Sequence, residues 1–287
     1  SMSIEPAENN HGIVFERIDV QNNNSIKAIA ENIDNSLLCT KIKNQNNVSV
    51  STIEHLMAAF NGLNIDNALV KINAPELPAL DGSSYNYIKK IIASGIKTQR
   101  SDRKYIKVLK KIEVNEGNKF ISVSPSSCLD VNVSISYPNT IIGNSKFFYN
   151  HTKKNFIKNL SQARTFTLSE DLEKMRIAGL AIGGNMNNAI VVDKFKIINP
   201  DGLRFDKEFV KHKTLDCIGD FYLLGLPLIG SVECFAPGHK LNQKFVKEIL
   251  RDKSNYKIER IENNLSTDQI YKMLHSNDVS DKVINVA

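Results

Sequence analysis

The chain has 287 residues, of which 41% are apolar and 24% are charged. This composition is typical of a globular protein with one large domain or two ordinary ones. No apolar run approaches the ~18 residues that a membrane-spanning helix needs. The first residues carry neither the basic flank nor the apolar stretch of a signal peptide, so we expect a cytoplasmic protein.

The formal net charge of +6 allows an anionic partner, such as nucleic acid, an acidic membrane surface or a phosphorylated small molecule. The lysines are spread along the chain, however, and no helix-turn-helix, zinc-finger or RNP-type aromatic motif occurs. A bias towards Lys, Asn and Ile is also typical of an AT-rich genome. We therefore predict that nucleic acid is not a partner.

Short apolar runs in the first hundred residues predict alternating strands and helices in a compact layer. Strands are expected at residues 13–15, 37–39 and 67–72, and helices at residues 53–60 and 85–93. The first helix has apolar residues at helical spacing from Ile53 to Phe60. Thr52 is its expected N-cap or first-turn residue, and Gly62 is expected to end it.

A polar, Gly-containing segment at residues 94–102 is the best candidate for a domain boundary, which we place between residues 1–98 and 99–287. The second half again passes from strand-rich to helix-rich sequence, which hints at an internal duplication. Strands are expected near residues 105–114, 120–124, 130–137, 189–192, 194–198 and 230–235, and helices at residues 155–164, 168–178, 209–224 and 241–251.

The most informative residues for chemistry are His212 and Asp216. In a helix they lie on one face, one turn apart, and can offer two ligands to a metal. Glu54-His55 supplies a second imidazole far upstream. Two imidazoles and one carboxylate form a catalytic zinc site with an open fourth position, and they also suit Fe(II). The alternatives are a solvated ion pair on the helix and an ordinary surface histidine.

Two further residues extend this pattern. Asp220 continues the same helical face and could orient a histidine by accepting its ring proton. Gly238-His239 follows Pro237 in an expected turn, a position that suits a histidine held at a cleft. Other common sites are excluded, because the chain has no P-loop, dinucleotide-binding glycine motif, nucleophile elbow or CxxC pair.

A series of motifs runs in one order from about residue 5 to about residue 250. They are Ser51-Thr52-Ile53-Glu54-His55-Leu56, the segments at 62–68 and 75–83, Ala163-Arg164-Thr165-Phe166, Gly183-Gly184, the segment at 199–205, His212-Lys213-xx-Asp216-xxx-Asp220 and Gly238-His239-xx-Asn242. Together they resemble the zinc-dependent UDP-3-O-acyl-N-acetylglucosamine deacetylases of Gram-negative bacteria.

The resemblance implies an α+β fold with two domains of related topology. Each would be a β-sheet layered against helices, with the active site in the cleft between them. It also implies that the enzyme hydrolyses the N-acetyl group of a UDP-linked, 3-O-acylated glucosamine in lipid A biosynthesis, releasing acetate and a free amine. We expect a monomer with at most peripheral contact with the inner membrane.

Roles for individual residues follow from the same resemblance. His55, His212 and Asp216 would bind Zn²⁺, and Glu54 would take a proton from the attacking water as general base. The N-terminal domain would thus contribute Glu54 and His55. The C-terminal domain would contribute His212, Asp216 and His239.

The developing oxyanion would be stabilised by zinc, by the hydroxyl of Thr165 and by a protonated His239. His239 would also protonate the leaving amine, and Asp220 would keep its imidazole charged and aligned. Lys213 would hold a substrate oxygen or phosphate. An insert at about residues 168–192 would form an apolar passage for the acyl chain. The expected substrate-binding residues are Lys213, Phe166, Gly238, Leu172, Ala181, Ala189 and Val191.

Two departures from the family pattern leave alternatives open. Family members usually carry a further segment before the one that matches Pro6-Ala7. Many also have a basic residue where this chain has Ala236-Pro237. The alternative functions are therefore a truncated, inactive homologue that binds zinc and lipid, and a zinc amidase that acts on a different substrate.

Overall fold

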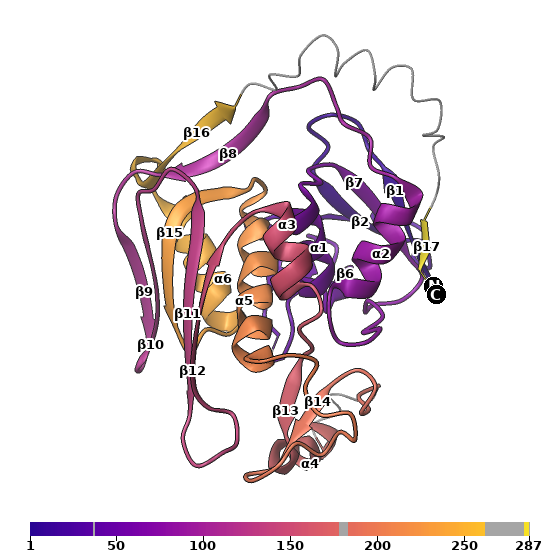
Figure 1. Cartoon of the computed structure of the whole chain (residues 1–287). Coiled ribbons are helices and arrows are strands. Elements are labelled where there is room, and N and C mark those ends of the chain that lie inside the picture. Colours follow the sequence, from indigo (N-terminus) through magenta and orange to yellow (C-terminus); the bar gives the residue numbers. More distant parts are fainter. Residues whose placement is uncertain (37, 178–182, 262–283, 287) are drawn as a thin grey trace.

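The computed structural model describes residues 1–36, 38–177, 183–261 and 284–286 (Figure 1). Two large β-sheets lie on opposite sides of the molecule, and a layer of helices separates them. This arrangement confirms the predicted α+β class. The helices are α1 (Glu54–Leu63), α2 (Tyr85–Ser94), α3 (Lys153–Asn155), α4 (Ser169–Ile177), α5 (Glu208–Phe221) and α6 (His239–Arg251).

The first sheet has the strand order β17-β1-β7-β2-β3. Only β2 and β7 run parallel, and the other neighbours are antiparallel. A smaller antiparallel sheet, β4-β5-β6, comes from the same part of the chain. The bounds are β1 (Met2–Pro6), β2 (Ile13–Arg17), β3 (Ser25–Lys27), β4 (Ile33–Asp34), β5 (Lys41–Lys43), β6 (Ser49–Ser51), β7 (Ala68–Ile72) and β17 (Ile284–Val286).

The second sheet has the order β12-β11-β15-β10-β9, and β8 joins it to β16. Strand β11 buries Leu129, Val131, Val133 and Ile135, every second residue, as expected for a strand with one face against helices. A two-stranded parallel sheet, β13-β14, lies apart beside α4. The bounds are β8 (Arg103–Val108), β9 (Ile112–Glu116), β10 (Lys119–Ser124), β11 (Leu129–Tyr137), β12 (Gly143–Asn150), β13 (Phe166–Leu168), β14 (Ile190–Val192), β15 (Leu228–Phe235) and β16 (Tyr256–Ile261).

Helices α1 and α5 cross in the middle of the molecule (Figure 1). Every residue of α1 is buried, because this helix is enclosed by other elements on all sides. Gly219 of α5 allows the crossing: a Cβ added there would lie 2.1 Å from the carbonyl oxygen of Glu54. The close approach brings the start of α1 against the C-terminal half of α5.

The predicted ends of the first helix were wrong. Thr52 does not cap α1; it lies before Ile53 and its hydroxyl donates to Glu76. Gly62 lies inside the helix, where a Cβ would meet the ring of Phe156 at 2.1 Å. Asn64 ends the helix instead, in the left-handed conformation at φ 61°.

Several predicted elements differ from the structure. Residues 38 and 39 form a bend rather than a strand, and residue 37 lies outside the described part. Residues 194–198 form a bend with a single bridge, and the helix expected at 155–164 runs instead over residues 153–160, as α3 followed by a π-helical segment at Phe156–Leu160. The run at 105–114 divides into β8 and β9, and β12 was missed. None of the described helices has both the length and the apolar character that crossing a bilayer requires.

Candidate metal centre and active site

Helix α5 carries four ionisable side chains at intervals of four residues, which places them along one face: Glu208, His212, Asp216 and Asp220. All four residues are buried, with at most 2% of their surface exposed. Burying an ionised group is costly unless it is paired. Each of these side chains therefore needs a partner from another part of the chain.

His55 reaches this face from α1. Its Nε2 atom lies 3.8 Å from Oδ1 of Asp216, and Nε2 of His212 lies 3.3 Å from the same oxygen. The two imidazole rings meet edge to face, with their centroids 5.1 Å apart. Among the described residues, these three form a buried group whose potential ligand atoms all lie within 4.8 Å of one another.

The hydrogen bonds around this group fit a cation. Nδ1–H of His212 donates to the carbonyl oxygen of Ala163 at 3.0 Å, which leaves its Nε2 lone pair facing Asp216. Oδ1 of Asp216 is buried and has no hydrogen-bond partner. Two imidazole nitrogens and a carboxylate oxygen that face one another are satisfied together by a divalent metal ion, with a coordination position left open.

The protonation states agree with this assignment. Burial, together with the neighbouring His212, lowers the pKa of His55 to about 3. Burial also lowers the pKa of His212. Burial alone would raise the pKa of Asp216, but electrostatic interactions with His212 and Lys213 outweigh this effect and hold that pKa below its usual range. At neutral pH the imidazoles are neutral and the carboxylate is ionised, which are the forms that bind metals.

A second polar cluster lies beside the metal group and links Glu54 to His239. Nδ1–H of His239 donates to Oδ2 of Asp220 at 2.9 Å, and the side-chain amide of Asn242 donates to the same oxygen at 2.7 Å. Nε2 of His239 lies 3.8 Å from Oε1 of Glu54. His239 is the first residue of α6, not part of a turn as predicted, and Gly238 is the N-cap.

The pKa values in this cluster suit proton transfer. Burial raises the pKa of Glu54 to about 7, against the opposing charge of His239. Burial would lower the pKa of His239, but the carboxylates of Asp220 and Glu54 raise it to about 10. A carboxylate with a pKa near 7 can accept a proton at neutral pH, and a protonated imidazole beside it can donate one.

Thr165 and Phe166 lie on the segment that passes the metal group. The backbone N–H of Thr165 donates to Gly82 at 2.8 Å, and its carbonyl oxygen accepts from the N–H of Ile190 at 2.8 Å. The ring of Phe166 is edge-on to that of His212, with a centroid distance of 6.4 Å. Both residues are half-buried.

Lys213 points towards the same region. Its Nζ lies 3.4 Å from Oδ2 of Asp216 and 5.7 Å from the centroid of the Phe166 ring. Its side chain keeps 20% of its surface exposed. The ammonium group therefore lies close to the metal group, on a side chain that solvent reaches in part.

The segment expected to form an acyl passage contains α4 and the paired strands β13 and β14 (Figure 1). Leu172 and Ala189 are half-buried, and Val191 is buried. Ala181 lies outside the described residues. The role of these residues in acyl binding stays a prediction.

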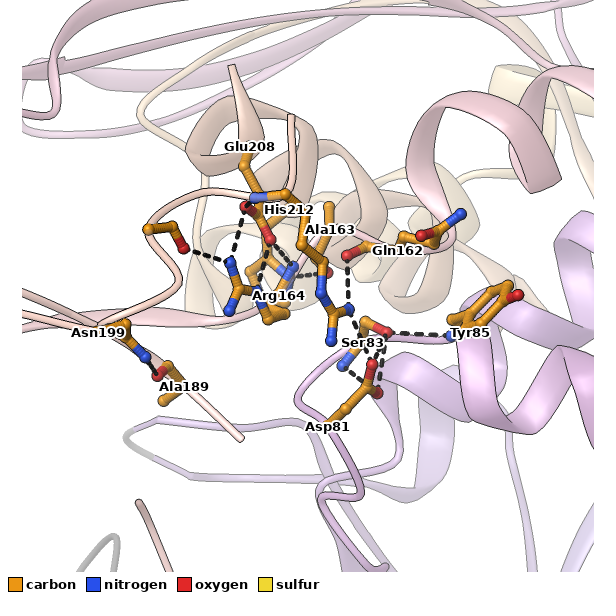
Figure 2. Close-up of polar contacts among 12 residues, drawn as sticks. Asp81, Ser83, Tyr85, Gln162, Ala163, Arg164, Ala189, Asn199, Glu208 and His212 are labelled. Atoms are coloured by element: carbon orange, nitrogen blue, oxygen red, sulfur yellow. Dashed lines mark hydrogen bonds and ion pairs between the residues drawn. The ribbon is translucent and has the colours of Figure 1, made fainter. Parts of the chain in front are cut away.

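The sequence reasoning missed a buried ion pair that supports the site (Figure 2). Glu208 accepts hydrogen bonds from the backbone N–H, Nε and Nη2 of Arg164 at 3.1, 2.8 and 3.1 Å, and from the backbone N–H of Arg204 at 2.7 Å. Because Ala163 directly precedes Arg164, the pair fixes the carbonyl group that holds His212. The signal was available: Glu208 lies four residues before His212 in the chain.

A second contact joins the two halves of the chain close to this pair (Figure 2). Nη1 of Arg204 donates to Oδ2 of Asp81 at 2.8 Å and to the carbonyl oxygen of Gln162 at 3.0 Å. The hydroxyl of Ser83 also donates to Asp81, at 2.9 Å. The segment around Asp81 is thereby tied to the segment before α5.

The geometry agrees with comparisons to known proteins. Residues 1–251 match the family model described as LpxC, UDP-3-O-acyl N-acetylglycosamine deacetylase. The chain belongs to the LpxC family. Proteins named UDP-3-O-acyl-N-acetylglucosamine deacetylase are similar over most of their length. The LpxC relative from Campylobacter fetus is 41% identical over 89% of this chain and 86% of its own. Those from Campylobacter hominis and Wigglesworthia glossinidia brevipalpis are 40% and 38% identical, each over 92% of this chain and over 89% and 90% of their own.

Proposed function

We propose that the protein is a zinc-dependent hydrolase that removes the N-acetyl group from UDP-3-O-(3-hydroxyacyl)-N-acetylglucosamine, with acetate and the free amine as products, in lipid A biosynthesis. The observation that carries the proposal is the buried group of His55, His212 and Asp216, with Glu54 and His239 facing each other beside it. Membership of the LpxC family and the names of the relatives support the choice of substrate.

The metal ligands would be His55, His212 and Asp216, with Zn²⁺ as the preferred ion and Fe²⁺ as the alternative. A bound divalent cation supplies Lewis acidity and lowers the pKa of water. The remaining chemistry belongs to the side chains. Glu54 accepts a proton from the water molecule that attacks the acetamide carbonyl carbon, since its pKa lies near 7.

The C–N bond then breaks, and the nitrogen leaves as an amine that needs a proton. Protonated His239 supplies it, because the imidazole lies 3.8 Å from Glu54 and its other nitrogen is held by Asp220. Before the bond breaks, the hydroxyl of Thr165 and the imidazolium of His239 donate hydrogen bonds to the developing oxyanion. Each such donor contributes about 2.7–4 kcal/mol in comparable enzymes.

Substrate contacts follow from the position of the remaining residues. Lys213 is assigned to a sugar or phosphate oxygen because its side chain is partly exposed and its ammonium group lies beside Asp216. Phe166, whose ring lies near that of His212, and Gly238, which directly precedes His239, are also assigned to substrate binding. The insert at residues 168–192, with Leu172, Ala181, Ala189 and Val191, is assigned to the acyl chain.

The two halves of the chain are assigned to two domains, at residues 1–98 and 99–287. In support, the strands of the first sheet come from residues 2–72, apart from β17, and those of the second from residues 103–261. We further propose a cytoplasmic monomer with at most peripheral contact with the inner membrane and with no nucleic-acid partner.

A deacetylation assay tests the function and separates it from the two alternatives. Release of acetate from the UDP-linked substrate should stop after chelation and return when Zn²⁺ is restored. A protein that binds zinc stoichiometrically but never releases acetate would be the inactive homologue. Activity confined to other amides would indicate a zinc amidase with a different substrate.

A further inference from the structure

Thr40 connects the two groups that are assigned to proton transfer. Its backbone N–H donates to Oε2 of Glu54 at 3.0 Å. Its hydroxyl donates to Oδ1 of Asp220 at 2.5 Å and lies 3.2 Å from Nδ1 of His239. Thr40 is fully buried and is 180 residues away from Asp220 in the sequence. Thr40 therefore has hydrogen bonds to both Glu54 and Asp220.

The hydrogen bond from the Thr40 hydroxyl restricts the rotation of the Asp220 carboxylate. A hydroxyl has one proton to donate, and here it goes to Oδ1. Oδ2 is then left for His239 and Asn242. Without the donor at Oδ1, the carboxylate would lose one of its three hydrogen bonds in a site without exposure to solvent, and its rotation would no longer be restricted.

The same residue orients Glu54. Because Oε2 is held by the N–H of Thr40, Oε1 is the oxygen that faces Nε2 of His239, at 3.8 Å. This separation is too long for a direct hydrogen bond. One substrate or water oxygen can instead lie within hydrogen-bond reach of both groups.

We propose that Thr40 is a positioning residue that sets the relative orientation of Glu54 and His239, through its backbone N–H and, by way of Asp220, through its hydroxyl. The inference rests on the proposed function, because it assigns Thr40 to the same proton transfers. Thr40 directly follows the bend at residues 38 and 39, where a strand was predicted.

The test compares Thr40→Val with Thr40→Ser in the full chain loaded with Zn²⁺. Valine has nearly the same shape but no hydroxyl, whereas serine keeps the hydroxyl. We expect Thr40→Val to retain one metal ion per chain and to lower kcat about 10- to 100-fold, with KM changed less than about threefold. Thr40→Ser should restore most of kcat. Thr40→Ala removes the same hydroxyl without adding a methyl group, and replaces Thr40→Val if that variant fails to fold.

Thr214→Val is the matched control. Thr214 is also fully buried, and its hydroxyl donates to the carbonyl oxygen of Val210 within α5. It should keep the wild-type kcat. An equal fall in Thr40→Val and Thr214→Val, or an equal fall in Thr40→Ser and Thr40→Val, would overturn the proposal, because packing rather than the hydroxyl would then be the cause.

Crystal structures of the variants give a second readout that does not depend on turnover. In Thr40→Ser the contact between Nδ1 of His239 and Oδ2 of Asp220 should stay near 2.9 Å. In Thr40→Val the Asp220 carboxylate and the His239 ring should be rotated or take two orientations. An unchanged pair in Thr40→Val would overturn the inference. A wild-type protein without deacetylase activity would instead overturn the proposed function.

Discussion

The crossing of α1 and α5 makes Gly219→Ala the most informative substitution outside the site. A Cβ at this position would lie 2.1 Å from the carbonyl oxygen of Glu54 and 3.1 Å from the backbone nitrogen of Ala58. The first distance is about 1.3 Å short of the 3.4 Å at which ordinary contact begins. Backbone atoms cannot rotate out of the way, so the two helices must move apart.

The direction of the change in the free energy of unfolding distinguishes steric overpacking from the general preference of helices for alanine over glycine. In an unhindered helix, alanine in place of glycine stabilises the protein by about 1 kcal/mol. Overpacking costs about 1–3 kcal/mol, and the contact here is backbone against backbone. The upper end of the overpacking cost exceeds this gain, so we expect a net fall in the free energy of unfolding of up to about 2 kcal/mol.

The metal group should be affected as well, because α1 carries His55 and α5 carries His212 and Asp216. Metal–ligand distances tolerate only about 0.2 Å of error, so we expect zinc affinity to fall at least about tenfold. Urea unfolding and competition with a chelator measure the two effects. Gly183→Ala is the control, since nothing that the structure describes lies within 4 Å of its Cβ position. Wild-type stability together with wild-type zinc affinity in Gly219→Ala would refute the reasoning.

Three further predictions follow from the site. Glu54→Gln should keep its zinc, measured by metal analysis, but lose about 10²–10⁴-fold in turnover, since glutamine cannot accept the proton; full activity would end the general-base assignment. His239→Ala should behave similarly, and excess imidazole should restore part of its turnover. Glu208→Gln should lower the free energy of unfolding by about 3–5 kcal/mol, because it leaves Arg164 charged and buried. Asp66→Asn breaks the more exposed pair with Arg103 and should cost about 1 kcal/mol or less; equal costs in urea titrations would contradict the burial argument.

The sequence predicted the site best where the functional residues lie on a single helix with regular spacing. His212, Asp216 and Asp220 repeat every four residues, so one correctly predicted helix is enough to place them on one face. The apolar runs of β2, β7, β10, β11 and β15 were predicted for a similar reason, because alternation and β-branched residues are local signals.

The residues that were missed depend on contacts that no local pattern encodes. Thr40 has an ordinary sequence environment. Its proposed positioning role depends on contacts with Asp220 and His239, which are 180 and 199 residues away. Gly62 was interpreted as a helix end because glycine is common there, yet it lies inside α1 against the ring of Phe156. Tertiary packing overrides such local preferences.

The most direct test of the central claim is anomalous diffraction from crystals of the zinc-loaded protein, recorded on both sides of the zinc absorption edge. We expect one strong peak within about 2.0–2.2 Å of a ring nitrogen of His55, a ring nitrogen of His212 and a carboxylate oxygen of Asp216. A fully occupied zinc peak elsewhere, with these three side chains left without a metal, would contradict it.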